Sequence, residues 1–165
     1  MTPVFPVPRI FSSLKFMPDD RMINTLVIGL GSYYGHDVSG LELIPALKNK
    51  FSQYPQLYFY ITNNPQDILV LTEKLKQQNL KQLIILDALP ENTPVCEITH
   101  YSHEQLQNIS SAVSDHSVSL YEVLEMVKLL YFPDLKISIL GLPDRPFPQI
   151  LQQSVALLKQ LAYSV

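Results

Sequence analysis

Apolar residues recur along the chain in two alternating patterns, short continuous runs and longer stretches with a spacing of three or four. Continuous runs are typical of strands that are buried on both faces, and the spaced pattern places apolar side chains on one face of a helix. The continuous runs cover residues 24–30, 57–62, 83–87 and 135–142. The spaced stretches cover residues 38–51, 64–75, 117–130 and 147–163. Because strands that alternate with helices form βαβ units, the sequence predicts a three-layer α/β/α sandwich with a mainly parallel sheet.

Several local features refine these elements. Residues 94–100 alternate between apolar and polar types, which predicts an edge strand. Pro45 lies inside the first helical stretch, so we expect that helix to start late or to bend there. Asn64 and Pro65 favour a helix start, with Asn as the cap and Pro at the first helical position. The residues of the helix over 117–130 that we expect to point inward are Val118, Tyr121, Leu124, Val127 and Leu130.

Residues 1–22 form an N-terminal extension ahead of a single predicted domain, which spans residues 23–165. Prolines at positions 3, 6, 8 and 18 interrupt the apolar stretch of this extension. A signal peptide needs an uninterrupted apolar core of about 7 to 15 residues, so the pattern does not predict one. We expect the extension to pack loosely on the domain or to be mobile. Met22, just before the first strand, is a candidate translation start.

Composition narrows the classes of function. No apolar run reaches the roughly 18 residues that a membrane span requires. The net charge of −3 gives no electrostatic reason to bind nucleic acid or an anionic membrane. Cys96 is the single cysteine, so it forms no internal disulfide, and we interpret it as structural rather than catalytic. We therefore expect a cytoplasmic protein, monomeric or weakly dimeric, with neither nucleic acid nor membrane as partner.

Three polar residues fall where this fold places its ligands. Open parallel sheets bind ligands beyond the carboxyl ends of their strands, where the strand order reverses, which in a 2-1-3 order lies between the first and third strands. Asp37 follows the first strand, and Asp87 ends the third. His116 directly precedes the helix over residues 117–130, whose dipole keeps an imidazole neutral. Two carboxylates and one imidazole predict a divalent-metal site with positions open for substrate or water.

Each of these residues also has a purely structural interpretation. Asp87 is then a turn former or a helix cap, and Asp37 is the N-cap of the helix that follows it. His116 is then a capping or structural histidine. Their common placement at one crevice is the reason to favour a site.

Other residues with chemical potential have weaker patterns. His36 is either a further ligand or acid–base group or, as we favour, a solvated loop residue. His100 and His103 match no helical metal motif with a partner carboxylate, so we interpret both as surface residues. The loop from Gly29 to Gly35 is one residue too long for the Gly-x-Gly-x-x-Gly motif, and no acidic residue ends the second strand. Dinucleotide binding is therefore not predicted.

The same motifs, in the same order, resemble the hydrogenase maturation endopeptidase family from Asn24 to the C-terminus. The family has a Gly-Asn-x-x-x-Gly-Asp-Asp/Glu-Gly-x-Gly loop, a strand ending in Asp-Ala, a Ser-x-His before a Leu-rich helix, and a Gly-x-x-Pro after its last strand. The matching segments here are residues 31–40, 83–88, 114–124 and 139–143. The resemblance implies a phosphorylase/hydrolase-like α/β fold. It also implies a hydrolase that removes a C-terminal peptide from the large subunit of nickel–iron hydrogenases once nickel is in place.

Matched position by position, the resemblance implies that Asp37, Asp87 and His116 bind the metal. It implies that Asp37 and His116 act in catalysis. The metal is a divalent ion, nickel, which we expect to be that of the substrate. The expected partner is the nickel–iron hydrogenase large-subunit precursor.

The chain also departs from the family pattern. Ser32 replaces the loop Asn, His36 replaces the first loop acid, and Val38 replaces the glycine that follows the acids. Residues 61–64 (ITNN) replace an Asp-Gly-Gly-Thr whose glycines allow close approach of a peptide backbone. These changes keep a second interpretation open, a non-catalytic metal- or partner-binding assembly factor on the same fold. A metal-independent nucleotide or flavin binder is a third.

Overall fold

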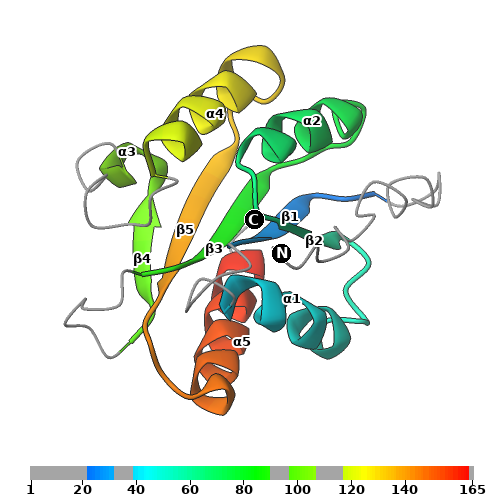
Figure 1. Cartoon of the computed structure of the whole chain (residues 1–165). Coiled ribbons are helices and arrows are strands. Elements are labelled where there is room, and N and C mark those ends of the chain that lie inside the picture. The colour runs from blue at the N-terminus through cyan, green and yellow to red at the C-terminus, as the bar shows by residue number, and fades with distance from the viewer. Residues whose placement is uncertain (1–21, 32–38, 90–96, 107–116, 164–165) are drawn as a thin grey trace, which may run out of the picture.

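A five-stranded, mainly parallel sheet with helices on both faces forms the centre of the protein (Figure 1). The computed structural model describes residues 22–31, 39–89, 97–106 and 117–163. The elements in chain order are β1 (Thr25–Leu30), α1 (Ser39–Lys50), β2 (Leu57–Thr62), α2 (Gln66–Lys74), β3 (Gln82–Ala88), β4 (Thr99–Ser102), α3 (His103–Leu106), α4 (Ser117–Leu130), β5 (Lys136–Leu142) and α5 (Phe147–Tyr163). The strand order is β2-β1-β3-β5-β4, and only β4 runs antiparallel to its neighbour.

The helices form two layers that cover opposite faces of the sheet. Helices α1 and α5 lie on one face, and α2 and α4 lie on the other (Figure 1). The buried strand β3 serves both layers, because successive side chains of a strand point to opposite faces. Leu83 and Ile85 pack in the cluster with α2 and α4, whereas Ile84 and Leu86 pack in the cluster with α1 and α5. The three-layer α/β/α prediction is therefore confirmed.

Most elements have the bounds that the apolar pattern predicts. The bounds of β2, α4 and α5 agree with the prediction, β1 and β5 differ from it by one residue at one end, and β3 is one residue longer at each end. Helix α1 already begins at Ser39, so of the two effects expected of Pro45 the late start does not occur. Pro45 is exposed inside this helix. No helix among the described residues is long and apolar enough to cross a membrane.

The start of α2 depends on a small hydrogen-bonded turn. Pro65 has helical backbone angles directly before Gln66, and the Asn64 side-chain oxygen accepts a hydrogen bond from the Gln66 N–H at 3.1 Å. The Thr62 hydroxyl donates to an Asp67 carboxylate oxygen at 2.5 Å. Helix α2 thus starts at the predicted Asn-Pro pair. Its first residue is Gln66, one position later than predicted.

Three details of the prediction are wrong. The edge strand exists, but it is β4 at Thr99–Ser102, and Glu97 and Ile98 lie before it; residues 94–96 lie outside the described residues. The short helix α3 had no signal in the apolar pattern. Leu130 is 54% exposed, because the inward face of α4 is formed by the predicted Leu124 and Val127 together with Leu120 and Val123.

Substitutions on α4 test which of its residues face the core. Leu124 is completely buried, so we expect Leu124→Ala to lower the free energy of unfolding by about 2–5 kcal/mol. Leu130→Ala, on the exposed side of the same helix, changes it by about 0.5 kcal/mol or less. Urea denaturation measures both values, and equal losses would contradict the described orientation of α4.

Candidate functional site

The carboxyl ends of the parallel strands form one edge of the sheet. In the register, Thr62 at the end of β2 pairs with Leu30 of β1, Leu30 pairs with Asp87 of β3, and Asp87 pairs with Gly141 of β5. The chain passes from β1 to β2 on one side and returns across β1 to β3 on the other. The strand order therefore reverses between β1 and β3, where open parallel sheets bind ligands.

Asp87 lies at this reversal point and is completely buried. It follows Leu83 and Ile85 in the alternation of β3, so its side chain belongs to the face that α2 and α4 cover. A buried carboxylate is costly unless hydrogen bonds or positive charge compensate it. Because Asp87 is buried at the edge where such sheets bind ligands, its carboxylate is a candidate functional group.

Two helices begin at the same edge of the sheet. Helix α4 ends before β5, which starts at the amino edge, so the first residue of α4, Ser117, lies at the carboxyl edge on the face of Asp87. Helix α1 begins at Ser39, after the connection that leaves β1 at Gly31. The chain therefore enters these helices directly after His116 and two residues after Asp37. Both of those residues lie outside the described residues.

Close packing surrounds the exit of β3. Gly141 pairs with Asp87, and a Cβ added to it would lie 2.6 Å from the Leu89 Cδ2 and 3.2 Å from the Tyr101 Cε2. The Leu89 N–H donates to the Leu142 carbonyl oxygen at 2.8 Å. A side chain at the position opposite Asp87 would therefore displace the end of the Leu89 side chain, and the chain after Asp87 is held against β5.

The metal prediction rests on residues that the structure places only in part. Within residues 22–31, 39–89, 97–106 and 117–163, no three His, Cys, Asp or Glu side chains come together as a metal-binding group. Asp87 is described, whereas Asp37 and His116 are not, and His36 and Cys96 also lie outside these ranges. The Asp37, Asp87 and His116 set thus stays a prediction.

His103 corrects the sequence analysis, because its side chain is buried and only 3% exposed. Its ring stacks on Tyr121 of α4, with centroids 5.1 Å apart and an interplanar angle of 22°. The His103 Nε2 lies 3.2 Å from the Glu125 Oε1. Burial lowers the pKa of His103, and the carboxylates of Glu125 and Glu104 oppose that shift. The surface prediction is confirmed for the exposed His100 and wrong for His103.

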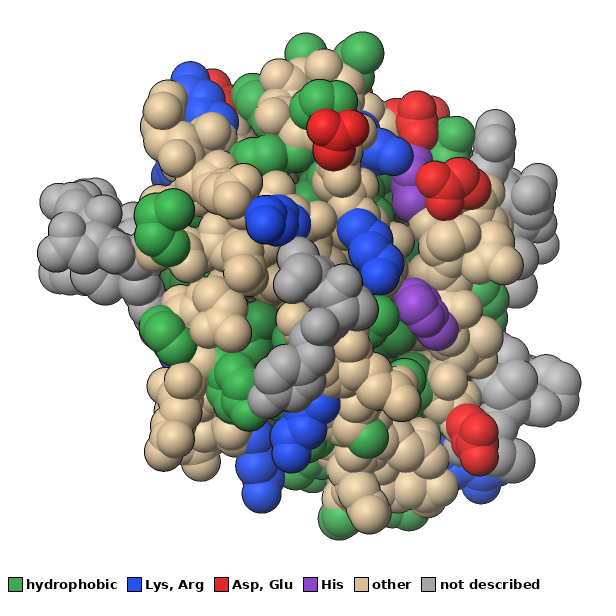
Figure 2. Space-filling view, turned by 180° about the vertical axis from the view of Figure 1, so that it is seen from behind, with side chains coloured by type: hydrophobic (Ala, Val, Ile, Leu, Met, Phe, Trp, Pro, Cys, Tyr) green, Lys and Arg blue, Asp and Glu red, His purple; other side chains and the backbone are tan. Residues whose placement is uncertain are grey.

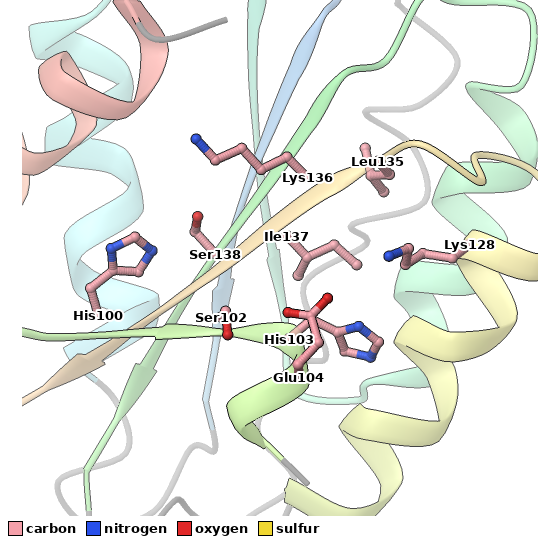
Figure 3. Close-up of a pocket in the computed structure, with 9 residues that line it drawn as sticks. All are labelled: His100, Ser102, His103, Glu104, Lys128, Leu135, Lys136, Ile137 and Ser138. Carbon is pink, nitrogen blue, oxygen red and sulfur yellow. The ribbon is translucent and has the colours of Figure 1, made fainter.

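A cavity of about 210 Å³ lies beside His103 (Figure 3). His103 and Glu104 lie close together in it, and His100 lies at its far end beside β4. On the face that is turned away in Figure 1, histidine, lysine and acidic side chains lie near one another (Figure 2). The full lining is His100, Ser102, His103, Glu104, Lys128, Leu135, Lys136, Ile137 and Ser138.

This cavity is distinct from the predicted site. The β5 residues that line it, Lys136, Ile137 and Ser138, are the first three of that strand. The cavity therefore lies at the amino edge of the sheet, at the end opposite Asp87. A second cavity, of about 430 Å³, lies at the same amino edge between residues 79–81 and 131–135. Both mix lysine with acidic side chains, so neither has the single-sign lining that selects a strongly charged ligand.

The comparisons with known proteins concern the fold. No family model matches the chain, and no curated protein matches its sequence. The structure is similar to that of an endopeptidase from Escherichia coli, with a TM-score of 0.59 and 15% identity over 84% of this chain and 94% of that one. It is also similar to a NiFe hydrogenase maturation protease, HycI, from Thermococcus kodakarensis, with a TM-score of 0.56 and 17% identity over 85% of this chain and 90% of that one.

A third similar structure has a different role. PbaA from Pyrococcus furiosus, an archaeal homolog of a proteasome-assembly chaperone, has a TM-score of 0.58 and 15% identity over 90% of this chain and 81% of that one. At such identities the likeness is one of fold. This chain has the α/β fold of the hydrogenase maturation proteases, which confirms the fold expected from the resemblance.

The buried His103 gives a pH dependence of stability. Its folded pKa lies below its unfolded value of about 6.5, so the unfolded state binds more protons as the pH falls through that value. Stability is therefore complete above about pH 6.5 and decreases below it. His103→Phe keeps an aromatic ring against Tyr121 and removes the titration. We expect this variant to lose less stability than the wild type between pH 7.5 and 5.5 in urea denaturation, and an equal loss would refute the assignment.

Proposed function

We propose that this protein is an endopeptidase that removes the C-terminal extension of a nickel–iron hydrogenase large-subunit precursor after nickel insertion. The observation that carries the proposal is the buried Asp87 at the point of strand reversal, on a fold shared with hydrogenase maturation proteases. The sequence motifs around Asp87 and before α4 support the same function. The similar structures share only 15–17% identity with this chain, so the assignment of this substrate is our own.

In this proposal, Asp37, Asp87 and His116 bind the nickel that the precursor carries. The nickel belongs to the substrate, so the precursor binds productively only after its metal has been inserted. Carboxylate oxygens and a neutral imidazole suit a divalent first-row metal. The start of α4 directly after His116 supports a neutral ring, because the helix dipole disfavours imidazolium at that end.

The proposed reaction is hydrolysis of one peptide bond. A water oxygen bonds to the scissile carbonyl carbon, the C–N bond breaks, and a proton passes to the leaving amine. Asp37 and His116 are the proposed catalytic residues, because as ligands of the nickel they fix the scissile bond in position for attack by water. Nickel bound in the substrate holds the scissile bond near these groups and polarises it.

A second function, a non-catalytic assembly factor, has specific support. The similar structure of PbaA belongs to a homolog of an assembly chaperone rather than to a protease. Asn63 and Asn64 follow β2 where the protease family has glycines, and Asn64 is used in the start of α2. This function predicts a stable complex with a partner whose mass does not change.

Intact-mass measurement of a nickel-loaded precursor separates the two functions. We expect the wild type to remove a defined C-terminal peptide. Asp37→Ala and His116→Ala each slow this cleavage by at least about 100-fold, because each removes a ligand that holds the nickel and the scissile bond in position. His100→Ala is the matched control, since His100 is exposed on the edge strand β4, which β5 separates from the strand of Asp87.

The outcomes point in different directions. Cleavage at the wild-type rate by both Asp37→Ala and His116→Ala would falsify the residue assignment. An unchanged precursor mass with the wild type, for a precursor that another protease of this kind does cleave, favours the assembly factor.

A further inference from the structure

The strand β2 has an outer edge that no other described strand covers. It is the last strand in the order β2-β1-β3-β5-β4. Its backbone pairs with β1 through alternate residues, since the Gln56 carbonyl oxygen accepts from the Thr25 N–H at 3.2 Å and the Thr62 carbonyl oxygen accepts from the Gly31 N–H at 3.1 Å. In this alternation, the N–H and C=O groups of Phe59 and Ile61 point away from β1.

Within the part of the chain that the structure describes, this edge lacks the usual protection against pairing. Exposed edges in natural proteins are kept short or carry charge, proline or a bulge. Strand β2 is six residues long, and its sequence LYFYIT contains neither a charged residue nor a proline. Its register with β1 is uninterrupted from Thr25↔Leu57 to Leu30↔Thr62. The opposite edge strand, β4, has only four residues.

The open edge is continuous with the candidate site. Thr62 ends β2 in register with Leu30, and Leu30 is in register with Asp87. A peptide beside β2 lies three strand spacings from β3, which is about 14 Å. About four or five extended residues span that distance, so one peptide reaches from β2 to Asp87.

We propose that β2 binds the C-terminal segment of the substrate precursor as an added strand, next to Phe59 and Ile61. This proposal rests on the proposed function and assigns the surface that holds the peptide. Main-chain hydrogen bonds then hold the segment without a demand on its side chains, as in other cases of strand addition. The segment continues past Thr62 to the carboxyl edge, where Asp87 lies in the same row as Leu30 and Thr62.

An extended peptide fits this edge better than a second copy of the chain does. A stable dimer buries about 1,600 Å² in total. The edge offers the outward backbone groups of Phe59 and Ile61, whose side chains are already half-buried against the cluster with α1 and α5. The remaining apolar surface is therefore small, whereas a single extended segment needs only the backbone groups.

The test replaces the outward N–H of Ile61. Proline at this position removes no hydrogen bond to β1, because the Ile61 N–H points outward. Ile61→Ala is the matched control, since it loses the side chain and keeps the N–H. With nickel-loaded precursor as substrate, we expect Ile61→Pro to raise KM about tenfold relative to Ile61→Ala at unchanged kcat. Thermal unfolding of both variants checks that each is folded.

A second measurement, on the wild-type protein, tests the proposal if the Ile61→Pro variant does not fold. Amide hydrogen exchange of Phe59 and Ile61 in the wild-type protein slows on addition of the precursor if a strand is added there. The amide of Leu26, inside the sheet, is the internal reference.

Each other outcome overturns the proposal in a recognisable way. Equal KM values for Ile61→Pro and Ile61→Ala, or unchanged exchange at Phe59 and Ile61, leave the protease function intact and remove β2 as the docking strand. Ile61→Pro that converts a dimer to a monomer assigns the edge to a second copy instead. A wild type that does not cleave the precursor ends both the proposed function and this proposal.

Discussion

The pairing of β3 with β1 on one side and with β5 on the other is the constraint on which the rest of the structure depends. It buries every residue of β3, so both helical layers must pack against it. It also brings the ends of the parallel strands into one row, in which Asp87 lies between Leu30 and Gly141. A carboxylate in that row is buried by the same packing that stabilises the sheet, and this is why the fold core and the candidate chemistry meet at one residue.

The two edges of the sheet have different properties. Asp87 and the starts of α1 and α4 lie together at the carboxyl edge. The strand order reverses there, and such a point is where open parallel sheets bind ligands. The amino edge holds two cavities of mixed charge and the buried His103, which packs from the start of α3 against Tyr121 of α4. Strand β2 forms one side of the sheet, and its outward backbone groups lead toward the carboxyl edge.

The same fold serves a protease and a homolog of an assembly chaperone among the similar structures. A fold of this kind provides a reversal point and open strand edges whatever the reaction is, so function depends on the groups placed there. The proposal of hydrolysis rests on Asp87 and on the sequence motif before α4. The asparagines after β2, one of which is hydrogen bonded at the start of α2, are the strongest argument for a binding role.

The sequence by itself determined the strands, the long helices and their alternation. Continuous apolar runs indicate buried strands such as β3, and apolar residues spaced by three or four indicate helices. Both are local signals that the sequence carries by itself. It also indicated that Asp87 ends a central strand. Only the tertiary structure decided the burial of His103, the position of β4, the short α3 and the exposure of Leu130. These depend on contacts between segments far apart in the chain, as between His103 and Tyr121, and no local spacing encodes which distant side chain covers a given residue.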